Sequence, residues 1–255
     1  MSQTALGPVP HLAFTVVEPR EGAHVSVSEL LREVREQDAL WRKTCKKARL
    51  PVFQFKAGGR EDGVARDGRN VITLATTRFC PKLARDSMDC YGKRRQAITH
   101  RYMSLDSSGT ATTSSAVEVD IEVNGANYRF VPTERWRGTE CAVPDASQHG
   151  PCGSDLPLGP VLLHELGHAF GLSHSCEGQV CIDNRIAAQS VMYPDTFSLG
   201  ELRPRVPADS DCAELERLYG ERPAPGWPYF LVVAGLVLLF GLWVKGWVKG
   251  RARER

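Results

Sequence analysis

The segment from residue 164 to residue 174 constrains the fold of this 255-residue chain more than any other part. It reads His-Glu-Leu-Gly-His-Ala-Phe-Gly-Leu-Ser-His, and its first half has the apolar spacing of a helix. On a helix, His164 and His168 are four residues apart and point from the same face. Gly171 can adopt a positive φ, which would end the helix and bring His174 back to the other two imidazoles.

Three imidazoles from this segment could hold one Zn²⁺ and leave a fourth position open for water, which is typical of a catalytic zinc site. Glu165 lies on an adjoining face of the same helix, where its carboxylate can reach a metal-bound water without being a ligand. The alternative, unrelated histidines on a core helix, requires five specified residues to fall at fixed spacing by chance. We therefore predict zinc ligands at His164, His168 and His174, with Glu165 as the catalytic base.

This pattern, HExxHxxGxxH, is the signature of the metzincin zinc peptidases, in which a methionine turn follows it. Met192 resembles that methionine, and the resemblance implies that it forms an apolar floor beneath the metal. Its surroundings, Val-Met-Tyr-Pro, are most similar to the turn of the matrixins. The matrixin resemblance implies that Tyr193 and Pro194 shape the substrate pocket.

The resemblance to matrixins implies an α+β domain of metzincin type. Such a domain has a twisted, mostly parallel sheet with an antiparallel edge strand, an active-site helix, a methionine turn and a C-terminal helix. Residues 116–124 resemble the edge strand, which aligns the substrate by strand addition, and residues 211–220 resemble the closing helix. The matrixin loop that is rich in His, Asp and Gly and carries structural zinc and calcium is missing, so we do not expect bound calcium.

Residue periodicity predicts the secondary structure of the first 220 residues. Residues 116–123 alternate between apolar and acidic side chains, which indicates a half-solvated strand, and Asn124-Gly125 favours a hairpin with residues 128–131. The other predicted elements are strands at 12–17, 52–55, 71–75 and 97–103 and helices from about 29 to 50, over about 158–170 and over 209–219.

The predicted activity is zinc-dependent endopeptidase cleavage of internal bonds in a protein or peptide, by a metal-bound water that Glu165 activates. The alternative is a membrane-anchored binding module that is catalytically silent and whose zinc only stabilises the fold, called here a zinc-stapled module. Such a module would be expected to lose Glu165 first, and Glu165 is present. The net charge of +2 gives no indication of nucleic-acid binding.

Residues 223–244 contain no charged side chain, a length that suits a helix crossing a lipid bilayer. Aromatic residues at both ends of this run are typical of the headgroup level. We therefore predict a peptidase domain over 1–220, a Pro-rich linker over 221–226, a transmembrane helix over 227–247 and a basic tail over 248–255.

The charge distribution predicts a single-pass membrane protein with an extracytoplasmic catalytic domain. Five basic residues follow the apolar run, and such residues favour the cytoplasmic side. Residues 1–20 show no secretory signal, which favours the alternative of a tail-anchored protein with a cytosolic catalytic domain.

The eight cysteines are dispersed and none forms a CxxC pair, which favours disulfides in an oxidising compartment over a thiolate metal site. The short spacings suit local bridges between Cys176 and Cys181 and between Cys141 and Cys152. The remaining connectivity is open, and reduced, buried thiols are the alternative.

Overall fold

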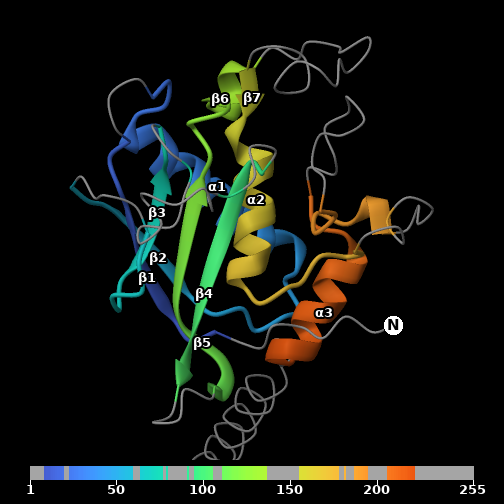
Figure 1. Ribbon diagram of the computed structural model, residues 1–255. Helices are drawn as coiled ribbons and strands as arrows, with labels where there is room; N and C mark the ends of the chain where they lie inside the picture. Colours follow the sequence, from blue (N-terminus) through green and yellow to red (C-terminus); the bar gives the residue numbers. More distant parts are fainter. Residues whose placement is uncertain are drawn as a thin grey trace, which may run out of the picture. The chain divides into compact units, whose positions relative to one another are not determined.

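A five-stranded sheet forms the centre of the computed structural model, in the order β2-β1-β3-β5-β4 (Figure 1). The strands are β1 (Leu12–Val16), β2 (Phe53–Ala57), β3 (Asn70–Leu74), β4 (Ala97–Leu105) and β5 (Ala111–Val123). All neighbouring pairs are parallel except β4 and β5, which are antiparallel. The structure describes residues 9–19, 23–59, 64–76, 79, 91, 95–105, 111–136, 155–177, 181, 187–194 and 206–221.

Two helices, α1 (Val27–Thr44) and α2 (Leu158–Ala169), pack against one face of this sheet (Figure 1). A capping box starts α1, because the Ser26 hydroxyl accepts a hydrogen bond from the Glu29 amide and the Glu29 carboxylate accepts one from the Ser26 amide. The fully buried Trp41 indole donates to the Leu163 carbonyl at 2.9 Å and ties α1 to α2. This bond fixes the helix that carries the histidine motif.

Strands formed at all six places where the sequence predicted them, but two predictions about their pairing are wrong. The segment 116–124, predicted as the edge strand, belongs to β5 and lies between β3 and β4, so that β4 is the edge. The predicted hairpin after β5 does not form. Instead, β6 (Arg129–Val131) pairs in parallel with β7 (Asp155–Pro157) in a separate two-stranded sheet. Both errors concern long-range pairing, which local alternation does not specify.

The acidic residues of β5 are buried, so the prediction of a half-solvated strand is also wrong. Glu118, Asp120 and Glu122 are 3 %, 0 % and 2 % exposed. The Glu118 carboxylate accepts hydrogen bonds from the amides of Asp67 and Gly68, and Asp120 accepts one from the Val71 amide. The turn before β3 therefore covers this face of the sheet. Burial raises the pKa of Asp120 to about 7 and that of Glu122 to about 8.

The buried Glu122 carboxyl should make stability fall as pH rises. The folded-state pKa of Glu122 is about 8, which exceeds the ordinary value of 4.5. The contribution of the Glu122 carboxyl group to folding stability is therefore complete below pH 4.5 and is lost as pH rises towards 8. We expect the urea midpoint of the wild type to fall between about pH 5 and 8, and to fall less for Glu122→Gln, which does not ionise. An equal fall in both proteins would contradict the assignment.

The third helix, α3 (Asp209–Tyr219), is joined to α1 by a disulfide between Cys45 and Cys212. Cys45 follows the last residue of α1, so this helix ends earlier than the predicted stop near residue 50. The predicted local bridge between Cys176 and Cys181 is confirmed, whereas the one between Cys141 and Cys152 lies outside the described residues. Disulfides are typical of proteins of oxidising compartments.

Loss of the Cys45–Cys212 bridge should strongly destabilise the fold, because it joins residues 167 positions apart in the sequence. We expect the paired Cys45→Ala and Cys212→Ala variant to lose about 2–5 kcal/mol in urea unfolding. The matched control removes Cys176 and Cys181, whose separation is only 5, and should lose less. An equal or greater loss in the control would contradict this prediction.

The predicted fold class, an α+β domain with an appended transmembrane helix, requires correction. The described chain is mixed α/β, with a mainly parallel sheet and three α-helices of 18, 12 and 11 residues. None of the helices in the described ranges is both long and apolar enough to cross a bilayer, which takes about 20 apolar residues. The predicted spanning segment 227–247, with its linker and tail, lies outside those ranges. Because no described helix could cross a bilayer, the predicted single-pass membrane localisation is corrected as well.

Candidate metal centre

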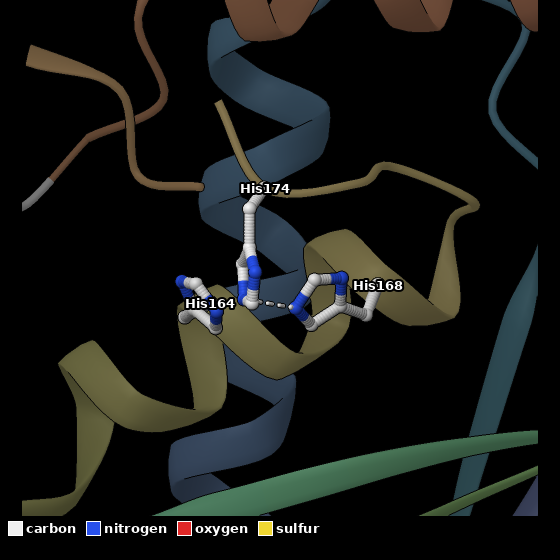
Figure 2. Close-up of side chains that lie close together, drawn as sticks. All are labelled: His164, His168 and His174. Atoms are coloured by element: carbon white, nitrogen blue, oxygen red, sulfur yellow. Dashed lines mark hydrogen bonds between the residues drawn. The ribbon is translucent and has the colours of Figure 1, made fainter. Parts of the chain in front are cut away.

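Three imidazoles converge at the C-terminal half of α2 (Figure 2). His164 and His168 project from one face of the helix, and His174 reaches back from the segment that follows it. One ring nitrogen from each histidine lies within 4.8 Å of those of the other two. His168 Nε2 and His174 Nε2 lie 3.2 Å apart, joined by the hydrogen bond drawn in Figure 2. This group could hold a metal ion.

The chain reverses at Gly171, as the sequence predicted. Its φ is +99°, a value that side-chain-bearing residues rarely adopt, and the Leu172 amide donates to the Gly167 carbonyl at 3.0 Å. The reversal also places the Leu172 carbonyl 2.8 Å from His168 Nδ1. The turn therefore brings His174 next to the other two histidines and also orients the His168 ring.

Backbone carbonyls fix the tautomers of the two helical histidines. His164 Nδ1 donates to the Val191 carbonyl and His168 Nδ1 to the Leu172 carbonyl, both at 2.8 Å. Because a carbonyl can only accept, each Nδ1 carries the proton and each Nε2 has a lone pair that could bind a metal. The His168 Nε2 lone pair accepts a hydrogen bond from His174 Nε2 at 3.2 Å. Neither carbonyl partner could be identified from the sequence.

Burial keeps the three histidines neutral. It lowers the pKa of His164, and it lowers the pKa of His168 and His174 with help from the neighbouring imidazoles, that of His174 to about 4. Only the neutral imidazole binds a metal. Metal binding near pH 7 would therefore not have to deprotonate charged imidazolium rings.

Glu165 is buried between α2 and the edge strand β4, with 6 % of its surface exposed. Burial raises its pKa to about 7, although the hydrogen bond from the Thr99 hydroxyl and the charge of Arg95 both lower it. A carboxyl group with a pKa near neutrality can both accept and release a proton. The sequence indicated Glu165 but not Thr99.

Met192 lies against the metal-site helix, where it is 2 % exposed. A Cβ atom at Gly167 would overlap the Met192 sulfur and stand 3.0 Å from Trp41 Cζ2. The glycine between the two helical histidines therefore lets the methionine approach the helix backbone. This close approach is why position 167 needs a glycine.

Asp211 of α3 holds the turn that contains Met192. Its carboxylate accepts hydrogen bonds from the Ser190 hydroxyl at 2.5 Å and from the Val191 amide at 3.0 Å. The Val191 carbonyl in turn orients His164. A residue 47 positions beyond His164 thus supports the metal site, a contact that local sequence patterns do not reveal.

Tyr193 and Pro194 follow Met192 at the surface of the same turn. The Tyr193 hydroxyl donates to the Cys181 carbonyl at 3.1 Å, and its ring packs against a small cluster of Cys176, Cys181 and Ala187. Pro194 is exposed. Their role in a substrate pocket stays a prediction.

No model of a known protein family matches this chain, and no curated protein matches its sequence. The functional argument therefore depends on the geometry of the site and the chemistry of its residues.

Proposed function

We propose that this chain is a zinc-dependent endopeptidase of the metzincin clan, most similar to the matrixins, that hydrolyses internal peptide bonds of proteins. The observation that carries the proposal is the convergence of His164, His168 and His174 beside the buried carboxyl group of Glu165. Three neutral imidazoles with an acid–base residue next to them are the arrangement that metal-assisted hydrolysis requires.

The donor set supports zinc as the metal. Calcium and magnesium prefer oxygen ligands, whereas all three donors here are imidazole nitrogens. Two ligands at zinc–nitrogen distances of about 2.0–2.1 Å and a tetrahedral angle stand about 3.3 Å apart. The 3.2 Å between His168 Nε2 and His174 Nε2 fits this value. When bound, zinc would supply a water of lowered pKa and polarise the scissile carbonyl.

The chain's own residues would then move the proton. Glu165 accepts it from the attacking water and returns it to the leaving amine, which needs a pKa near the working pH. The pKa of about 7 that burial gives Glu165 supports this role. Its place next to His164 also favours a peptidase over a silent zinc-stapled module, because a module that only binds has no need of an acid–base residue beside the metal ligands.

The edge strand offers a way to hold the substrate. β4 is the outermost strand of the sheet and lies next to α2, which carries the metal site (Figure 1). An extended peptide could add to such an edge by main-chain hydrogen bonds and present its backbone to the metal. In this proposal, β4 takes the role that the resemblance to matrixins implied for residues 116–124.

The proposal is tested by removing and restoring the metal. The purified full chain is stripped with a chelator, titrated with Zn²⁺ and incubated with unfolded casein. We expect cleavage to appear with zinc and to reach a plateau at one zinc per chain. Saturable zinc binding with no cleavage would favour the silent module, and cleavage that persists without metal would reject the proposal.

A further inference from the structure

The carboxyl group of Glu165 is held by a side chain from a different element. Thr99 lies on β4 directly opposite Ile121 of β5, and opposite residues of an antiparallel pair share one face of the sheet. Ile121 belongs to the core beneath the helices, so Thr99 faces α2. Its hydroxyl oxygen is 2.5 Å from Glu165 Oε2 and 3.0 Å from the Glu165 carbonyl oxygen.

The Thr99 hydroxyl is the hydrogen-bond partner that determines where this carboxylate points. Within the described ranges, no other residue forms a hydrogen bond with it. The distance to Oε2 falls in the range of about 2.5–2.7 Å that charge-assisted O–H···O⁻ bonds adopt. Because Thr99 engages Oε2, the second oxygen, Oε1, stays available for proton transfer. The contact to the Glu165 carbonyl also keeps the hydroxyl next to the first turn of the motif.

We propose that Thr99 is a positioning residue of the hydrolytic reaction: its hydroxyl holds the Glu165 carboxylate in the orientation needed for proton transfer. This inference rests on the proposed peptidase function. A glutamate has three rotatable side-chain bonds, and a misplacement of about 1 Å in a catalytic group can cost about 100-fold in rate. The edge strand would then have two roles, because the strand that could bind the substrate backbone also orients the base.

If the Thr99 hydroxyl itself is needed, a substitution that removes it should lower activity and one that keeps it should not. If Thr99 only fills space, the shape of the side chain should matter instead. Thr99→Val keeps the branched shape but removes the hydroxyl, whereas Thr99→Ser keeps the hydroxyl and removes only a methyl group. The matched control is Thr73→Val. Thr73 is a buried threonine of β3 that lies in register with Glu122. Glu122 follows Ile121 in β5 and so points to the other face of the sheet, which places Thr73 on the face opposite Thr99.

The kinetic test compares the four zinc-loaded full-length proteins on one peptide substrate that the wild type cleaves. We expect Thr99→Val to lower kcat about 10- to 100-fold, with KM within about twofold and zinc content unchanged. Thr99→Ser and Thr73→Val should keep kcat within about threefold of the wild type. A kcat for Thr99→Val equal to that of the wild type, or an equal loss in Thr99→Ser, would overturn the positioning role.

Crystal structures of the same zinc-loaded variants provide a readout that does not depend on activity. We expect Glu165 to keep one side-chain conformation in Thr99→Ser and to adopt several in Thr99→Val. One unchanged conformation in both variants would overturn the inference even if the peptidase is active. If wild type and Thr73→Val both bind zinc but cleave nothing, the proposed function itself fails, and the inference fails with it.

Discussion

The Glu165→Ala variant is expected to cleave peptides about 10²–10⁴-fold more slowly than the wild type, because it lacks the group that transfers the proton. Zinc should stay bound at one ion per chain, since the three imidazoles come from other residues. The measurements are kcat on a peptide substrate and metal content by atomic spectroscopy on the same dialysed sample.

The matched control for this variant is Glu36→Ala, which removes an exposed carboxylate from α1 and should leave kcat within about twofold. Wild-type turnover in Glu165→Ala would contradict the mechanism. Loss of zinc from Glu165→Ala would instead show that Glu165 is a ligand or a structural support for the ligands.

The His174→Ala variant is expected to lose zinc affinity and activity together. His174 comes from outside α2 and supplies one of the three ligand nitrogens, so two imidazoles would remain. Loss of a residue that merely supports a ligand typically weakens metal binding about 10- to 100-fold, so loss of a ligand should cost at least about 100-fold. Zinc competition with a chromogenic chelator measures the affinity.

The control here is His24→Ala, because His24 is exposed and lies outside the three-histidine group. Its zinc affinity and activity should equal those of the wild type. Full zinc occupancy of His174→Ala after dialysis against chelator would show that His174 is not the third ligand.

The geometry of the metal centre was predictable because it is local in sequence. Two histidines one helical turn apart share a face in any α-helix, and the glycine that ends the helix needs only its own conformational freedom. The structure bears this out at His164, His168 and Gly171. Eleven consecutive residues therefore determine most of the candidate site.

The supporting contacts were not predictable, because they join distant parts of the chain. Thr99 is 66 positions from Glu165, and the Val191 carbonyl is 27 positions from His164. Cys45 and Cys212 face each other only after α1 and α3 have packed, so dispersed cysteines gave no connectivity for them. Such partners depend on sheet order and helix packing.

In strand β5, the alternation of apolar and acidic residues did not predict which side chains are buried. The strand's apolar and acidic residues alternate as in a strand with one solvent-exposed face, yet both kinds of residue are buried from position 118 to position 123. The turn around Asp67 and Gly68 supplies amide donors to Glu118, and the Val71 amide binds Asp120. A pattern of residue types identifies the two faces of a strand, but only the remaining chain determines which face meets water.

The most direct test of the central claim is a digest of an unbiased peptide library by the zinc-loaded full chain, with cleavage sites read by mass spectrometry. The account predicts cuts at internal peptide bonds that disappear on chelation, return with one zinc per chain and are absent for Glu165→Ala. No internal cleavage by the zinc-loaded wild type, or the same cuts by Glu165→Ala, would contradict it.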